Sequence, residues 1–222
     1  MNRDEREWLR GTNYDRVLWS LYRAPFARRG TRPYRCFAVA SVRLIWEHLT
    51  GPQRHAVEAS EFYLEGYYSN RQRADARAKI GLIPTDILGT ADAVYWATAA
   101  PTDIRVSCHT AANYVRQVVT RSRGREAGAA LDATYIAFLR DLFGNPFRPA
   151  HSVIPAWRRW NRGAVVRVAE DIAAKQAFEH LPILADALEE AGCTDAAILG
   201  HCRGPGPHVR GCWVVDLLRG QA

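Results

Sequence analysis

Residues 34–50, YRCFAVASVRLIWEHLT, decide the fold class of this chain. Their apolar side chains recur three or four positions apart, which places them on one face of a helix. The Gly51-Pro52 pair that follows is a typical stop signal. We therefore predict one amphipathic core helix over 34–50. Its apolar stripe consists of Tyr34, Phe37, Ala38, Val42, Ile45, Trp46 and Leu49.

The same helical period extends in both directions from this segment, whereas the alternation of period two that marks strands is nearly absent. We expect Asn2 to cap a first helix, Asp132 to cap a helix that Gly144 ends, and Thr194 to begin a short one. The extended stretch 147–155 is the best candidate boundary. The prediction is an all-α, irregular multi-helix bundle with two abutting helical lobes, 1–144 and 145–222, which are also compatible with one single domain.

Composition indicates a globular protein, because 48% of the 222 residues are hydrophobic and can form a sizeable core. No apolar run reaches the ~18 residues that a membrane span requires. The charged start MNRDEREW leads into no apolar signal-peptide core, so we expect a cytoplasmic protein without membrane contact. The five cysteines are an odd, scattered set, which suits reduced thiols.

A net charge of +7 raises the alternative of a nucleic-acid-binding accessory protein. Only Lys79 and Lys175 of the 30 basic residues are lysine, and heavy arginine and alanine usage also follows from a GC-rich coding sequence. The test of this alternative is whether one basic face contains Arg123, Arg125, Arg158, Arg159 and Arg162.

Aromatic and basic side chains alternate in the segment WRRWNR, residues 157–162. Tryptophan and arginine are enriched at the centres of protein interfaces, and they also stack on bases or contact phosphates. Tryptophans beside a core helix commonly serve packing instead. The candidate binding residues are Trp157, Arg158, Arg159, Trp160 and Arg162.

Residues 201–212, HCRGPGPHVRGC, hold the densest group of side chains that bind zinc in proteins. If the last helix begins near Pro207, two of these side chains lie four positions apart on one face. The stretch has no Cys-x-x-Cys pair, however, and free cysteine is often a small core residue, so packing is the competing interpretation. The candidate zinc ligands are His201, Cys202, His208 and Cys212.

A cysteine nucleophile is a further alternative, with Cys202 or Cys212 near His208 and with Asp216 as the group that orients the imidazole. The neighbouring pair Cys108 and His109 is the other candidate, although the two side chains point in different directions on a helix. Members of such a triad are recognised by geometry, which spacing along the chain does not establish. We therefore assign no catalytic residue and favour a non-catalytic protein, while an enzyme stays open as an alternative.

Three stretches resemble an uncharacterised all-helical family common in planctomycete bacteria. They are FGNPFRP (143–149), LPILADALEEAGC (181–193) and GPGPHVRGCW (204–213), and the opening Glu7-Trp8-Leu9 and the Ile45-Trp46 pair are also similar. The resemblance covers about the last 80 residues well and about the first 60 loosely. The family has no assigned activity, so the resemblance implies a helical class and a bacterial cytoplasm and no catalytic residue.

These observations favour a non-catalytic protein-protein interaction or regulatory module that acts through a protein partner. A nucleic-acid-binding protein with an Arg/Trp-rich face is the first alternative, and a small zinc-binding module or enzyme is the second. We expect no cofactor unless residues 201–212 bind zinc.

Overall fold

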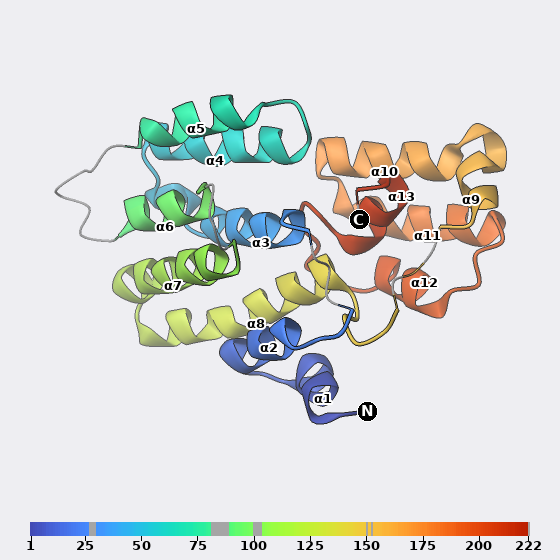
Figure 1. The fold of residues 1–222 in the computed structure, drawn as a ribbon, viewed down its shortest axis with the longest axis horizontal. Coiled ribbons are helices and arrows are strands. Elements are labelled where there is room, and N and C mark those ends of the chain that lie inside the picture. The colour runs from blue at the N-terminus through green and yellow to red at the C-terminus, as the bar shows by residue number, and fades with distance from the viewer. Residues whose placement is uncertain (27–29, 81–88, 100–103, 150, 152, 222) are drawn as a thin grey trace. The chain divides into compact units, whose positions relative to one another are not determined.

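In a computed structural model, the protein is described over residues 1–26, 30–80, 89–99, 104–149, 151 and 153–221. These residues form thirteen α-helices, three short 3-10 helices and no strand, which confirms the all-α class (Figure 1). Within them, no helix has the length and apolar character needed to cross a bilayer. The α-helices are α1 (Arg3–Arg10), α2 (Tyr14–Tyr22), α3 (Arg32–Arg43), α4 (Gly51–Leu64), α5 (Asn70–Ala78), α6 (Thr90–Ala97), α7 (Ile104–Arg123), α8 (Arg125–Phe143), α9 (Pro155–Arg159), α10 (Ala164–Lys175), α11 (Leu181–Glu190), α12 (Ala196–Cys202) and α13 (Trp213–Arg219), and the 3-10 helices are η1 (Trp46–His48), η2 (Trp160–Arg162) and η3 (Phe178–His180).

The chain divides into two compact units, and their limits differ from the predicted lobes 1–144 and 145–222. One unit comprises Met1–Gly11, Asp15–Gly30 and Ile136–Ala222, and the other comprises Thr12–Tyr14 and Thr31–Tyr135. The N-terminal residues belong with the C-terminal part because they bond to the end of α8. The indole Nε1 of Trp8 donates to Gly144 O at 3.0 Å, and Arg140 Nε donates to Trp8 O at 2.9 Å.

In the unit that contains residues 31–135, α3 packs against α6 and α7, and α4 packs against α5 (Figure 1). The predicted helix over 34–50 is two elements, because α3 ends at Arg43 and the 3-10 helix η1 follows. Ile45 and Leu49 both remain buried across this break. The tighter turn thus keeps the apolar stripe in the core while the chain reverses toward Thr50, whose capping box begins α4.

Asp132 does not begin a helix, since α8 runs continuously from Arg125 to Phe143. The only break between α7 and α8 is Gly124, which has a φ of +93°. The Asp132 carboxylate instead accepts hydrogen bonds from Arg116 at 2.7 Å and from the Tyr14 N–H at 3.1 Å. Its role is a tertiary contact within this unit.

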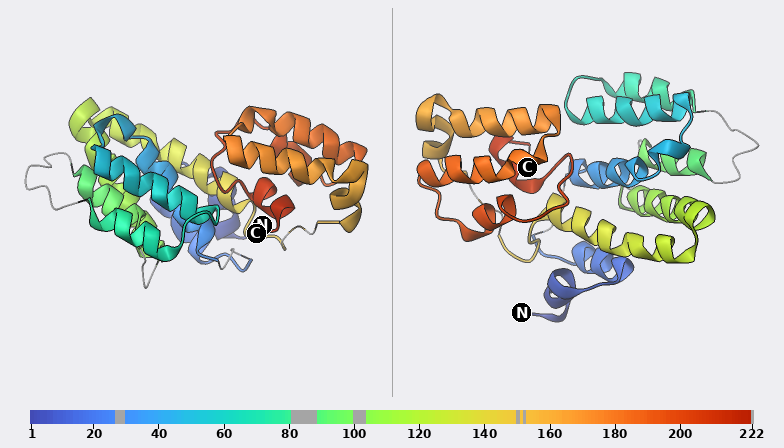
Figure 2. Two further views of the ribbon diagram at one scale, coloured as in Figure 1. Left: turned by 90° about the horizontal axis from the view of Figure 1, so that it is seen from above. Right: turned by 180° about the vertical axis from the view of Figure 1, so that it is seen from behind.

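The other unit has its main core among the C-terminal helices, where α10 packs against α11 and α13, and α11 packs against α12. These neighbours stay side by side in the two further views of Figure 2. Asp195, not Thr194, caps α12, because its carboxylate accepts from the Ala197 N–H at 2.9 Å. The last helix begins at Trp213, six residues later than the predicted start near Pro207.

Candidate metal centre

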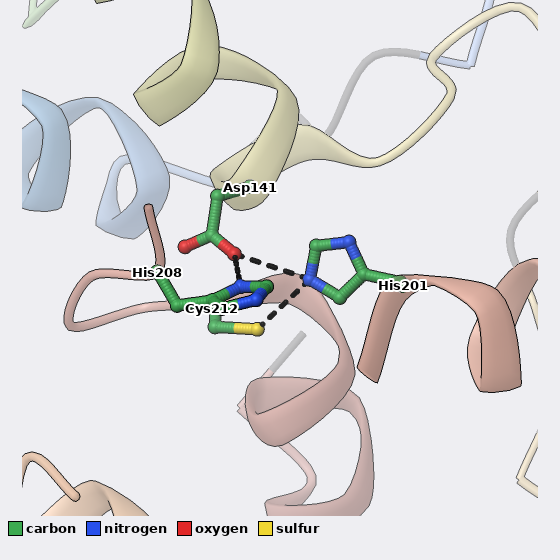
Figure 3. Close-up of side chains that lie close together, drawn as sticks. All are labelled: Asp141, His201, His208 and Cys212. Carbon is green, nitrogen blue, oxygen red and sulfur yellow. Dashed lines mark hydrogen bonds and ion pairs between the residues drawn. The ribbon is translucent and has the colours of Figure 1, made fainter. Parts of the chain in front are cut away.

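Four side chains with metal-binding atoms converge within the unit that contains the C-terminal helices. They lie close to the ends of secondary-structure elements, and one ligand atom from each lies within 4.8 Å of all the others. Figure 3 shows the side chains pointing toward one another from α8, from α12, from the loop after α12 and from the residue before α13. The four residues are Asp141, His201, His208 and Cys212.

The local backbone brings these side chains together. Gly144 has a φ of +60° and ends α8 one turn after Asp141, as its position in the sequence predicts. The loop that follows α12 turns at Gly206, where φ is +73° and an added Cβ would lie 2.9 Å from the backbone nitrogen of His208. The Val209 N–H donates to Asp141 Oδ2 at 2.9 Å, which ties this loop to the end of α8.

One carboxylate oxygen lies at the centre of the cluster. Asp141 Oδ1 is 2.6 Å from His208 Nδ1 and 3.1 Å from His201 Nε2. The same His201 nitrogen is 3.2 Å from Cys212 Sγ. Asp141 and Cys212 are buried, and the two histidines are half-buried, so the group is largely withdrawn from solvent.

The electrostatics of the cluster depend on this burial. Burial opposes the ionisation of Asp141, but hydrogen bonds from His201 and His208 outweigh it and lower the pKa of the carboxyl. For His208, burial disfavours the charged form, yet the bond to Asp141 raises the pKa of the imidazole. Burial raises the pKa of the Cys212 thiol well above its ordinary value, and the Asp141 charge adds to that effect. The thiol is therefore protonated unless a cation binds beside it.

The donor set fits zinc. Carboxylate, imidazole and thiolate are all zinc ligands, and four of them make the closed tetrahedral set of structural sites. Ligand atoms about 2.0–2.3 Å from a tetrahedral ion lie roughly 3.3–3.8 Å apart. The contacts of 2.6, 3.1 and 3.2 Å in the cluster are shorter than this, so these side chains would have to separate when an ion binds. Calcium and magnesium prefer oxygen ligands and are a poorer match.

Hydrogen bonds outside the cluster orient three of the four ligands, as second partners do in metal sites. His208 Nε2 faces Gly204 O at 3.5 Å, which leaves Nδ1 directed at the cluster. The Val209 N–H holds the outer oxygen of Asp141. The backbone N–H groups of Val214 and Val215 donate toward Cys212 Sγ and favour the thiolate.

The same geometry argues against a cysteine nucleophile. In a Cys-His-Asp triad the thiol and the carboxylate contact different nitrogens of the imidazole. Here Cys212 Sγ and Asp141 Oδ1 both approach His201 Nε2. Cys212 is also fully buried with a raised thiol pKa, whereas reactive cysteines have a lowered pKa and solvent access.

Three of the four predicted zinc ligands meet here, and Asp141 takes the place predicted for Cys202. Cys202 follows His201 in α12 and points into the helical core, where burial raises the pKa of its thiol to about 12. Asp141 is 60 positions before His201, on a helix whose end is marked by Gly144. No local pattern connects these two residues, so this ligand emerges only when the chain is folded.

The predicted binding residues of the segment 157–162 are divided between core and surface. Trp157 is only 4% exposed and belongs to the core of its unit, so the structure places this predicted binding residue away from the surface. Arg158 donates to Leu218 O at 3.3 Å near the end of α13, and Trp160 is half-buried against the core. Only Arg159 and Arg162 are exposed without such a packing role.

Comparison with models of known protein families, with curated proteins and with solved structures finds no match to this chain.

Proposed function

We propose that this protein is a non-catalytic helical module that binds one zinc ion, and that the ion joins the end of α8 to the C-terminal helices. The observation that supports the proposal is the convergence of Asp141, His201, His208 and Cys212 within 4.8 Å. Elements far apart in the sequence supply these ligands, so a bound ion would act as a cross-link and stabilise the fold.

A structural role follows from the number of ligands. Catalytic zinc sites hold the ion with three protein ligands and keep a fourth position for water or substrate. Here four protein ligands would fill a tetrahedral shell. Two of them, Asp141 and Cys212, are buried, which leaves little access for a substrate.

The proposal is tested by metal content. We expect one zinc per chain in protein reconstituted with Zn²⁺ and then freed of excess metal. Replacement of zinc by Co²⁺ should give the absorption of a tetrahedral site together with a thiolate-to-cobalt charge-transfer band. Both signals should be lost in Cys212→Ser and retained in Cys202→Ser, because Cys202 is equally buried and lies outside the cluster. Substoichiometric zinc in the wild-type protein would refute the proposal.

A protein partner is our second proposal, and the exposed Ile183 beside a pocket between α10 and α11 supports it. Ile183 is 55% exposed and, with the half-buried Val168, contributes accessible apolar surface to a pocket of about 410 Å³. The polar side chains that line the same pocket are Arg167, Asp171 and His180. Exposed apolar side chains beside polar ones are a feature of protein interfaces. None of the five cysteines forms a disulfide, which suits the reducing cytoplasm in which we place the protein.

The partner proposal is tested by affinity purification from the native cells. A protein that is captured by the wild type, lost with Ile183→Asp and retained with Val106→Asp would support it. Val106 is the matched control because it is a similarly exposed aliphatic residue, on α7 of the other unit. A capture pattern that Ile183→Asp does not change would contradict this surface as the interface.

The nucleic-acid alternative has less support. Arg123 forms an ion pair with Glu47, and Arg158 is held against the carbonyl of Leu218. Two of the five arginines on which a continuous basic face depends are therefore already engaged by the protein itself. Binding that weakens steeply with salt would be the observation that restores this alternative.

A further inference from the structure

Three arginines gather in the unit that contains residues 31–135. The guanidinium carbons of Arg35, from α3, and Arg73, from α5, lie 5.7 Å and 5.2 Å from the ring centre of Tyr63. One turn after Arg73, Arg77 stacks on Tyr95 at 3.8 Å. Arg73 is only 1% exposed, so at least one of these charges is in the interior. We call Arg35, Arg73 and Arg77 the arginine cluster.

The hydrogen bonds of the cluster go to neutral oxygens. Arg35 donates to Ala99 O at 2.7 Å, and Arg73 donates to Thr98 O and, at 2.7 Å, to Asn70 Oδ1. The Nε–H group of each of the three arginines is buried and has no partner. No carboxylate of the described residues forms an ion pair with any of them.

Three other partly buried arginines of the same unit are each neutralised by a carboxylate, whereas Arg54 donates to the carbonyl of Trp46 at 3.3 Å. Arg32 pairs with Glu65 at 3.2 Å, Arg43 with Glu61 at 2.5 Å, and Arg116 with Asp132 at 2.7 Å. A single arginine held by carbonyls has a structural explanation, as for Arg140 in the other unit, which donates to the carbonyls of Trp8 and Gly11 at the end of α1. Three adjacent cations without a countercharge are not explained in this way, because each one adds repulsion to the cost of burial.

The electrostatics agree with this description. Burial lowers the pKa of Arg73, and the positive charges of Arg35 and Arg77 lower it further. Burial also lowers the pKa of Arg35. An anion bound at the Arg77 guanidinium, which lines a pocket, would offset this repulsion and accept charge-assisted hydrogen bonds from Arg77.

A pocket of about 350 Å³ lies beside Arg77. Among the described residues that line this pocket, all except Arg77 and the exposed Asp92 are apolar or aromatic, and no ion pair joins Arg77 to Asp92. The pocket thus has space for an uncharged body next to a cationic end. The lining side chains beyond these two are Ala74, Ala78, Ile80, Ala91 and Tyr95.

We propose that Arg77, reinforced by the uncompensated charges of Arg35 and Arg73, binds the phosphate group of a small phosphate monoester, whose apolar body lies in the pocket beside Arg77. A phosphate dianion is favoured over a carboxylate because it carries more charge to offset three nearby cations and more acceptor oxygens for the Arg77 guanidinium. This site is in the unit without the proposed zinc ligands and is independent of them.

The test is calorimetric titration with phenyl phosphate, with inorganic phosphate as the second probe, at constant ionic strength. We expect phenyl phosphate to bind more tightly than inorganic phosphate. Arg77→Gln should weaken phenyl phosphate binding by about tenfold or more, which is the value of a charge-assisted contact. Arg77→Lys, which keeps the charge, should retain more affinity than Arg77→Gln.

Arg71→Gln is the matched control, since Arg71 is on the same helix, is 92% exposed and lies outside the cluster. It should bind phenyl phosphate as the wild type does. Absence of phenyl phosphate binding, or equal binding by Arg77→Gln and the wild type, would overturn the proposed site. Inorganic phosphate binding as tightly as phenyl phosphate would overturn the role of the pocket. Circular dichroism of each variant confirms that it is folded.

Discussion

Zinc should stabilise the wild-type protein and should not stabilise Cys212→Ser. Ligand that binds only the folded state adds RT ln(1 + [L]/Kd) to the free energy of unfolding, which is about 2.7 kcal/mol when free zinc is a hundred times the Kd. For a chain of this size, each kcal/mol raises the Tm by about 2–4 °C. The expected increase is therefore about 5–11 °C between chelator and zinc.

Cys212→Ser removes the only thiolate of the cluster, and we expect its Tm to be nearly the same in chelator and in zinc. The substitution also puts a hydroxyl in a buried thiol site, which costs roughly 1–3 kcal/mol without any metal. Cys202→Ser isolates that cost, because Cys202 is equally buried in the same unit. It should lower the Tm in both buffers and keep the zinc-dependent increase.

The assay is differential scanning calorimetry of the three proteins at one pH, with free zinc set by a metal buffer. Two results would refute the reasoning. One is a wild-type Tm that zinc does not change, and the other is an equal increase in Cys212→Ser. Loss of the increase in Cys202→Ser would show that the metal binds elsewhere than in the four-residue cluster.

Three further predictions concern stability. Gly144→Ala should lower the free energy of unfolding by roughly 1–2 kcal/mol for the left-handed backbone, and by more because the new Cβ would lie 3.2 Å from Trp213. Gly192→Ala is the comparison in urea titrations and should cost less, because Gly192 has a φ of +87° and open space around it. Burial raises the pKa of the Tyr135 hydroxyl above its ordinary value of 10.0. The contribution of the protonated hydroxyl to stability is therefore complete below pH 10 and is lost as the pH rises further. Tyr135→Phe loses the hydrogen bond from the Tyr135 hydroxyl to Ala112 O, at a cost of about 1 kcal/mol, and should flatten the decline in stability between pH 10 and 11. An unchanged decline would contradict the assignment of this pH dependence to Tyr135. Trp157→Ala should cost about 3–5 kcal/mol as a core deletion, whereas Arg159→Ala should change the free energy of unfolding by less than about 0.5 kcal/mol; similar costs for the two variants would disprove the division of the segment 157–162 into core and surface.

Part of the candidate metal site could be predicted from the sequence because its ligands are close together along the chain. His201, His208 and Cys212 span twelve residues, and the glycines between them indicate a turn that can bring them together. The choice between His201 and Cys202 could not be made in this way. It depends on which side of α12 faces the core, and that is decided by the helices packed against it.

The sequence by itself determined the all-α class, the Asn2 cap, which accepts from the Glu5 N–H at 2.7 Å, and the end of α8 at Gly144. These features are local, since helical periodicity, caps and left-handed glycines depend on neighbours a few positions away. Tertiary structure alone decided that Asp132, inside α8, contacts Arg116 of α7 instead of capping a helix. It also decided that Asp141 completes the cluster with His201, because contacts across 60 positions depend on how helices pack and leave no periodic signal in the chain.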